Sequence, residues 1–257
     1  MDSKKIVVKV GTSTLTHETG KINLRRIECL VKVLADLMNM GHKVILVSSG
    51  AIGVGVGKLG LSEKPSSTRQ KQALAAIGQA SLMTIYEKFF EEYGYSTGQV
   101  LLTKYVFEDK DRYESAKAAF QTMLDFGVIP IVNENDVIST YEIEFGDNDT
   151  LSAYVANLVD ADTLVLLSDI DGFYDGNPND EGSHLIPVIY EVTDKIKECA
   201  GGEGTRRGTG GMITKLNAAE LVCPNGIDMI ITNGDQPENL YKIINSESIG
   251  TLFPGKR

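Results

Sequence analysis

The sequence contains little cysteine and no long uninterrupted apolar run. Its three cysteines, Cys29, Cys199 and Cys223, lie far apart and form no CxxC pair, which argues against a disulfide framework and a structural zinc site. No window reaches the roughly 18 consecutive apolar residues that a membrane-spanning helix needs. The amino-terminal MDSKKIVVKV runs directly into a strand-like segment and has no signal-peptide pattern. We therefore expect a soluble, cytoplasmic protein with no membrane partner.

Basic residues are scarce relative to acidic ones. The 257-residue chain has 25 Lys and Arg against 35 Asp and Glu, a formal net charge of −10. Sequence-independent nucleic-acid binding requires a basic surface, so we expect no nucleic-acid partner. A phosphate-bearing substrate must instead be held by a local cluster of donors. The length fits one large domain or two small ones.

Short apolar segments alternate with segments of helical periodicity. The strand-like segments are 5–10, 43–47, 99–103, 128–132, 163–167, 228–232 and 250–253. The helical patterns lie near 24–40, 70–93, 115–126, 150–159, 193–200, 215–223 and 237–245. Continuous apolar strands joined by helices predict an α/β fold with a mainly parallel sheet covered on both faces. Such sheets bind ligands beyond the carboxyl ends of their strands, so the residues that follow each strand are the informative ones.

The first two predicted strands end in small residues. Lys9 lies inside an otherwise apolar strand just before Gly11, Thr12 and Ser13. A lysine buried there is unfavourable unless an anion pairs with it; the alternative is an edge lysine whose charge reaches solvent. After the second strand, Ser49-Gly50-Ala51 can offer N–H groups and a hydroxyl to an anion at a helix start.

Two clusters of acidic and amide residues follow the fourth strand. The first is NEND, residues 133–136, and the second contains Asp147, Asn148 and Asp149 at the mouth of a predicted helix. A single Asp or Asn would suffice to cap that helix, so three leave side chains to be explained. NEND alone is equally compatible with a polar turn. Together, the two clusters can converge on one polar ligand that carries an ammonium group.

A glycine-rich segment, GTRRGTGGMITK at 204–215, leads into a predicted helix. It places Thr209, Gly210 and Gly211 before the helix and Lys215 in its first turns. Backbone N–H groups and a lysine at a helix N-terminus suit the phosphates of a nucleotide. Arg206 and Arg207, just before it, are equally compatible with a phosphate contact and with solvation.

Three other pattern matches are rejected. Gly55, Gly57 and Gly60 spell GxGxxG, but the turn after that strand is already made by 48–50. The carboxy-terminal GTLFPGK has P-loop spacing, but no helix can follow it. Asp169, Asp171 and Asp175 lack the ligand order and closing glutamate of an EF-hand.

Six motifs carry a family resemblance: KVGTS, VSSGAI, NEND, GDND, SDIDGFYDGNP and TGGMITK, in this order. From Lys9 to about Phe253, the chain resembles the amino-acid kinase superfamily, and within it the bacterial glutamate 5-kinases. Any one motif is weak, whereas six in order are specific. The resemblance implies a single domain over 1–257, a three-layer αβα sandwich on a mainly parallel sheet. An amino-acid-binding lobe would span approximately 1–160 and a nucleotide-binding lobe approximately 161–257.

The resemblance also implies an activity and a set of site residues. The γ-phosphoryl group of ATP, carried with Mg²⁺, would pass to the side-chain carboxylate of L-glutamate in the first step of proline biosynthesis. Lys9 and Lys215 would neutralise the transferring group while Asp149 holds both lysines, and capping by residues 147–149 would be secondary. The substrate would be bound by Ser49, Gly50, Asn133, Asp136, Asp147 and Asn148. The nucleotide would be bound by Lys9, Ser168, Asp169, Thr209, Gly210, Gly211, Met212, Ile213, Thr214 and Lys215.

The chemistry of that reaction fits the residues independently. A carboxylate acceptor is already ionised at neutral pH, so the reaction needs alignment and cationic shielding and no general base. Accordingly, none of the three histidines, His17, His42 and His184, lies in a motif. No metal ligand from the protein is expected, because Mg²⁺ would arrive with ATP.

Alternatives of two classes remain at this point. One is another enzyme of the superfamily, acting on acetylglutamate, aspartate, carbamate or uridylate; paired carboxylates favour an acceptor with a free ammonium group. The other is a non-enzymatic sensor of nucleotide or amino acid, which would have no use for Lys9, Asp149 and Lys215 together. Many bacterial relatives carry a further RNA-modification-type (PUA) domain, which we do not expect here. The resemblance suggests a homo-oligomer and a glutamyl phosphate reductase as partner.

Overall fold

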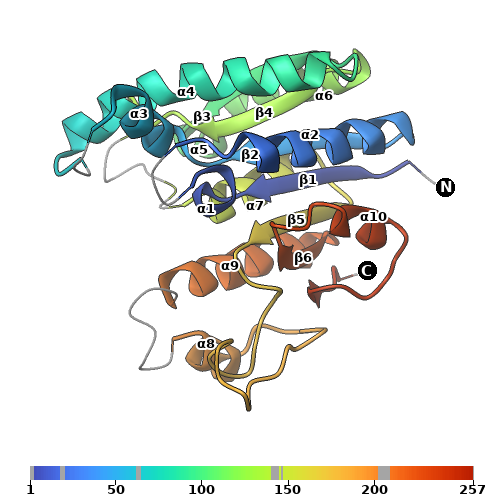
Figure 1. Ribbon diagram of the computed structural model, residues 1–257. Coiled ribbons are helices and arrows are strands. Elements are labelled where there is room, and N and C mark those ends of the chain that lie inside the picture. Colours follow the sequence, from blue (N-terminus) through green and yellow to red (C-terminus); the bar gives the residue numbers. More distant parts are fainter. Residues whose placement is uncertain are drawn as a thin grey trace.

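The computed structural model describes residues 3–17, 21–61, 65–139, 145, 147–201 and 209–256 (Figure 1). These residues form a seven-stranded sheet with the strand order β3-β4-β2-β1-β5-β6-β7. All neighbouring strands pair in parallel except β6 and β7, which are antiparallel. The strands are β1 Lys5–Val10, β2 Lys43–Ser48, β3 Thr97–Leu102, β4 Ile129–Glu134, β5 Thr163–Ser168, β6 Asp228–Asn233 and β7 Thr251–Phe253. The predicted mainly parallel sheet is confirmed.

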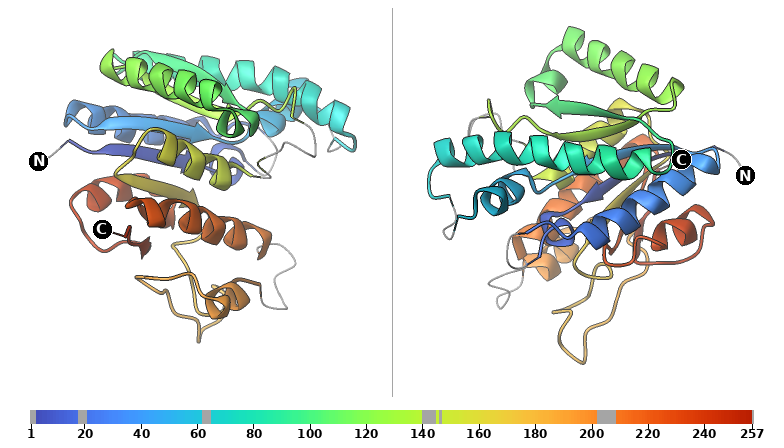
Figure 2. Two further views of the ribbon diagram at one scale, coloured as in Figure 1. Left: turned by 180° about the vertical axis from the view of Figure 1, so that it is seen from behind. Right: turned by 45° about the horizontal axis from the view of Figure 1, so that its top comes forward.

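Helices cover both faces of this sheet, which completes the predicted αβα sandwich. One face packs against α2 (Leu24–Asn39), α4 (Thr68–Glu91) and α10 (Asn239–Ile244). The opposite face packs against α6 (Lys110–Asp125), α7 (Asn148–Leu158) and α9 (Thr209–Val222), which lie in front of the sheet in the left view of Figure 2. The remaining helices are α1 Thr12–Leu15, α3 Ala51–Leu59, α5 Tyr105–Glu108 and α8 Asp194–Gly201.

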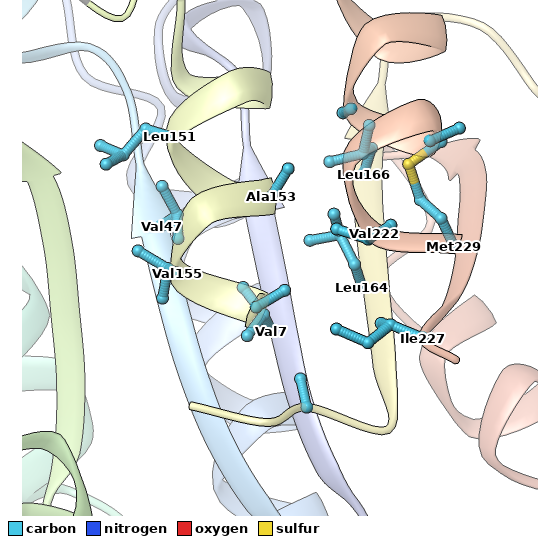
Figure 3. Packing of buried hydrophobic residues seen from close by; sticks show 14 of the residues in the cluster. Val7, Val47, Leu151, Ala153, Val155, Leu164, Leu166, Val222, Ile227 and Met229 are labelled. Atoms are coloured by element: carbon cyan, nitrogen blue, oxygen red, sulfur yellow. The ribbon is translucent and has the colours of Figure 1, made fainter. Parts of the chain in front are cut away.

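The core consists of two apolar clusters, one on each face of the sheet. Along β1, Ile6 and Val8 belong to the cluster under α2, whereas Val7 belongs to the cluster under α7 and α9. Figure 3 shows Val7 among side chains of neighbouring strands and of α7 and α9. Because successive strand residues point to opposite faces, Lys9 shares the face of Val7 and is directed toward α7. Strands buried on both faces explain the continuous apolar runs in the sequence.

One sheet runs through both predicted lobes. β1, in the first 160 residues, pairs in parallel with β5, in the rest of the chain, and Lys9 is in register with Leu166. The carboxyl ends of β1, β2, β4, β5 and β6 therefore lie along the same edge. Within the described ranges, every helix is too short or too polar to cross a bilayer.

Two helix boundaries differ from the sequence predictions. No helix was predicted between the segments 43–47 and 70–93 beyond a helix start after Gly50, whereas the structure forms the complete helix α3 there. Thr209, Gly210 and Gly211, predicted to precede α9, lie in its first turn. Both errors have one cause: glycine lowers helix propensity by about 1 kcal/mol per residue, and tertiary packing outweighs that preference. In α3, Gly55 lies so close to α4 that a Cβ there would be 2.1 Å from the carbonyl oxygen of Leu74.

Candidate active site

Three charged side chains from distant parts of the chain meet at the carboxyl edge of the sheet. Lys9 from β1 places its Nζ 2.6 Å from Oδ1 of Asp149 at the start of α7. Lys215 from α9 places its Nζ 3.0 Å from the other carboxylate oxygen, Oδ2. Exposed fractions are only 8% for Lys9, 3% for Asp149 and 8% for Lys215. One carboxylate therefore holds two ammonium groups in a nearly water-free setting, which excludes the edge-lysine alternative for Lys9.

The electrostatics of this cluster leave an excess positive charge. Burial raises the pKa of Asp149, but the charges of Lys9 and Lys215 outweigh burial and hold its pKa below the usual range. Asp149 is therefore ionised at neutral pH. Two cations against one anion give the cluster a net charge of about +1, which suits it to an incoming phosphate or phosphoryl group.

The second turn of α9 contributes further polar groups beside the cluster. Thr214 Oγ1 has two acceptors for its one hydrogen, Oδ2 of Asp149 at 2.9 Å and the carbonyl oxygen of Gly211 at 2.8 Å. Lys215 also donates to that carbonyl, at 3.1 Å. Met212 and Ile213 pack partly against the core. Of the predicted nucleotide-binding residues in 209–215, the structure thus brings Thr214 and Lys215 to Asp149. Arg206, Arg207 and the side chain of Thr209 lie outside the described part of the chain.

The start of α7 gives its three polar residues three different contacts. Asp147 is the N-cap: its Oδ1 accepts from the backbone N–H of Thr150 at 2.8 Å. Burial raises the pKa of Asp147 above its usual value. Asp147 therefore caps α7, and the expectation that capping is secondary at this helix start stays a prediction. A substrate contact of Asp147 stays a prediction.

Asn148 belongs to a network of uncharged groups. Its Nδ2 donates to Oγ of Ser49 at 2.9 Å and to the carbonyl oxygen of Ser48 at 3.3 Å, both at the end of β2. Oδ1 of Asn133 at the end of β4 is a third acceptor, at 3.0 Å, so the two hydrogens of this NH₂ group are shared among three acceptors. The structure therefore brings three of the predicted substrate-binding residues, Ser49, Asn133 and Asn148, into direct contact.

Asp136 lies nearby, in the turn after β4. It lines a hollow of about 200 Å³ between α4, β3 and the 134–137 segment, together with Gln79 and Glu134. The hollow adjoins the uncharged network because Gln79 contacts both. Asp136 is thus placed beside the predicted amino-acid site, and its contact with substrate stays a prediction.

Gly50 and Gly11 keep the backbone open at this edge. Gly50 has a φ of +100°, which other residues rarely adopt, and it is the N-cap of α3. A Cβ at Gly11 would lie 3.7 Å from Nζ of Lys9, against the side of the charged cluster. The N-terminus of α3 therefore presents its free N–H groups next to Ser49, as an anion site requires.

Ser168 and Asp169 lie at the end of β5, on the far side of β1 from Ser49. Ser168 is buried and donates to Oδ1 of Asp169 at 3.1 Å. Neither residue has a described contact with the charged cluster, so their nucleotide contact stays a prediction. Nothing among the described residues groups three metal-ligating side chains.

Comparison with known proteins shows which family the chain belongs to. The sequence model of the amino acid kinase family matches residues 4–233. The chain belongs to this family. Two solved structures share the fold. Carbamate kinase from Giardia lamblia bound to AMP-PNP has a TM-score of 0.69 and 19% identity, covering 99% of each chain. Isopentenyl phosphate kinase from T. acidophilum has a TM-score of 0.63 and 18% identity, covering 96% of this chain and 99% of that one.

Curated relatives of this amino acid kinase are much more similar in sequence. Glutamate 5-kinase of Clostridium perfringens is 58% identical over 261 residues, covering 100% of this chain and 97% of the relative. That of Listeria monocytogenes is 51% identical, covering 100% and 95%. Glutamate 5-kinase of Thermoanaerobacter sp. is 53% identical over 250 residues, which are 97% of this chain but 67% of that longer relative.

One residue of the uncharged network, Gln79, was not predicted from the sequence. Gln79 accepts from Nδ2 of Asn133 at 3.0 Å and is only 8% exposed. A signal existed: Gln79 lies in the buried stripe of α4 with Ala75, Leu82 and Tyr86, at spacings of four, three and four residues. A glutamine in an apolar stripe must be paired, but its partner comes from another element and is not readable from local periodicity.

Proposed function

We propose that this amino acid kinase transfers the γ-phosphoryl group of MgATP to the side-chain carboxylate of L-glutamate, giving L-glutamyl 5-phosphate. The proposal is supported by glutamate 5-kinases that are 50 to 58% identical to this chain over its whole length. The observation that carries the chemistry is the Lys9–Asp149–Lys215 cluster, two ammonium groups held 2.6 and 3.0 Å from one buried carboxylate.

Phosphoryl transfer between two anions is limited by charge repulsion and alignment. The acceptor carboxylate is ionised at neutral pH, since its ordinary pKa is about 4.3, so no base has to remove a proton. Lys9 and Lys215 lie on opposite sides of Asp149 and can shield the phosphoryl group as it passes from donor to acceptor. Asp149 holds both lysines in place without contributing a proton itself.

The acceptor would lie toward Ser49, Asn133, Asp136 and Asn148. Carboxylate and amide oxygens there suit the ammonium group of glutamate, which N-acetylglutamate and UMP lack. ATP would lie toward Ser168, Asp169 and the first turn of α9, whose N–H groups and Lys215 suit phosphates. Mg²⁺ would be carried by the phosphates of ATP.

Further features of the proposal concern the context of the reaction. The two lobes would divide the work, with glutamate bound by approximately 1–160 and ATP by approximately 161–257. The product is an acyl phosphate, which hydrolyses readily, so direct use by a glutamyl phosphate reductase in proline biosynthesis follows from its chemistry. We also propose a homo-oligomer, measurable by light scattering.

The test is ADP release from MgATP with a panel of acceptors: glutamate, N-acetylglutamate, aspartate, carbamate and UMP. Hydroxylamine in the assay traps any acyl phosphate as a hydroxamate. We expect ADP release only with glutamate, together with the γ-hydroxamate. Turnover with another acceptor would retain the charged cluster and overturn the glutamate assignment. Absence of turnover with every acceptor, from folded protein that binds ATP, would favour the sensor.

A further inference from the structure

A chain of four uncharged side chains crosses from α4 to the end of β2. Gln79 Oε1 accepts from Asn133 Nδ2 at 3.0 Å, Asn133 Oδ1 accepts from Asn148 Nδ2 at 3.0 Å, and Asn148 Nδ2 donates to Ser49 Oγ at 2.9 Å. These residues belong to α4, β4, α7 and the turn after β2. Gln79 is one end of the chain and the only member outside the predicted substrate site.

Backbone groups fix how both asparagines are oriented. The carbonyl oxygen of Ser48 can only accept, so Asn148 must direct its NH₂ group toward it, at 3.3 Å. The N–H of Glu134 can only donate, so Asn133 must direct Oδ1 toward it, at 2.9 Å. Asn133 is only 3% exposed, and its NH₂ group then points into the core and needs an acceptor.

Gln79 supplies that acceptor. It comes from a helix that is held rigidly against α3, because a Cβ at Gly78 would lie 1.8 Å from the carbonyl oxygen of Ala51. With its NH₂ group engaged, Asn148 has its Oδ1 left to accept, and no described residue donates to that atom. A carboxamide oxygen at the amino-acid site is a partner for an ammonium group.

We propose that Gln79 is a positioning residue for the amino-acid acceptor, holding Asn133 so that Asn148 presents its carboxamide oxygen to the ammonium group of the substrate. This inference rests on the proposed function. Gln79 touches neither the charged cluster nor the first turn of α9 among the described contacts. Its removal should therefore affect binding of the acceptor and leave ATP binding and phosphoryl transfer nearly unchanged.

The decisive variant is Gln79→Met, which keeps the length of the side chain and removes its oxygen. We expect the glutamate KM to rise about tenfold, the order of one lost buried hydrogen bond, with the ATP KM and kcat within about twofold of wild type. Gln79→Glu keeps an oxygen for Asn133 and should restore most of the lost glutamate affinity. Gln121→Met, the same substitution on α6, should leave the glutamate KM, the ATP KM and kcat unchanged.

A double-mutant cycle with Asn148→Ala separates positioning from a structural role. If Gln79 acts through Asn148, adding Gln79→Met to Asn148→Ala should raise the glutamate KM no further. The proposal would be overturned if Gln79→Met raised the glutamate KM by the same factor in the wild-type and the Asn148→Ala backgrounds. It would also be overturned if Gln79→Met alone lowered kcat and the affinity for ATP in parallel. If wild-type protein does not use glutamate, the proposed function fails first, and the same cycle on the acceptor that is used decides the role of Gln79.

Discussion

Two adjacent residues at the start of α7, Asn148 and Asp149, belong to two different kinds of site. Asn148 joins a chain of neutral amides and hydroxyls, and Asp149 joins two lysines in a buried ionic cluster. Successive residues of a helix point about 100° apart, so one helix start can serve both sites at once. The amide chain depends on the direction of each hydrogen bond, whereas the ionic cluster depends on which groups are charged.

This difference suggests a division of labour. Neutral, directional contacts select the acceptor and should govern KM for the amino acid. The excess positive charge acts on the moving phosphoryl group and should govern kcat. Among the described contacts, no side-chain hydrogen bond or ion pair joins the two sites, which meet at the backbone of α7. Substitutions in each should therefore give separable kinetic effects.

The largest effect is expected for Lys215→Met, which keeps the apolar stem and removes the charge. Loss of one preorganised charge partner of the transition state should lower kcat about 10³-fold, with the glutamate KM changed little. Initial rates of hydroxamate formation measure this, and the melting temperature checks the fold. Lys197→Met is the matched control, since Lys197 pairs with Glu220 at the surface, 2.8 Å apart, and its loss should not affect kcat. A wild-type kcat in Lys215→Met would remove the ionic cluster from the mechanism.

The second prediction concerns stability. Asp149→Asn keeps the shape of the side chain but leaves Lys9 and Lys215 buried without an anion. The free energy of unfolding should fall by about 3 kcal/mol, as when one partner of a buried ion pair is removed. Urea denaturation measures it. Asp160→Asn, which breaks an exposed pair with Lys117, should cost less than about 1 kcal/mol. A similar loss in both variants would show that burial of the cluster has no energetic consequence.

The sheet was predicted from sequence patterns and the ionic cluster from the family resemblance, and both were predicted better than the contacts of the amide chain. Apolar runs identify buried strands by themselves, and a lysine inside such a run requires an anion. Gln79 could not be assigned in this way, because its partner Asn133 lies 54 residues away and only the packing of α4 on β4 brings them together. Long-range pairing of neutral groups leaves little trace in one sequence.

The glycines of α3 show the opposite case, in which a local pattern was visible but its cause was not. Gly55 and Gly60 match a dinucleotide motif, which we rejected. In the structure, Gly55 permits close packing on α4 and Gly60 ends α3 with a φ of +64°. Close helix packing and phosphate binding both require glycine, so spacing alone does not distinguish them.

The third prediction tests whether this packing maintains the amide chain. Gly78→Ala places a Cβ 1.8 Å from the carbonyl oxygen of Ala51 and must push α3 away from α4. The free energy of unfolding should fall by about 1–3 kcal/mol, and the glutamate KM should rise because Gln79 moves with Gly78. Gly53→Ala is the control: its Cβ would lie 3.5 Å from Thr12 Cγ2, an ordinary contact, so stability should be equal or higher. Unchanged stability in Gly78→Ala would contradict the close packing.

The smallest effect, and a change of sign, is expected at Asp147. Burial raises its folded pKa, so Asp147 lowers stability as pH rises from about 3.9 through that raised value. Asp149 behaves in the opposite way. Burial raises its pKa, but Lys9 and Lys215 lower the pKa overall. Asp149 therefore adds stability above about pH 3.9, and this stability is lost as the pH falls through its pKa in the folded state.

Asp147→Asn removes the ionisable group but keeps an equally good N-cap. The free energy of unfolding of this variant at pH 7 should therefore lie within about 0.5 kcal/mol of the wild-type value or above it. Between about pH 4 and 7, where the carboxyl group of Asp147 titrates, the free energy of unfolding should change more favourably with rising pH in the variant than in wild type. Urea denaturation at several pH values measures this. A loss of stability at pH 7 as large as that of Asp149→Asn would mean that the carboxylate of Asp147 does more than cap α7. The two aspartates, two residues apart, would then no longer divide into a cap and an ionic centre.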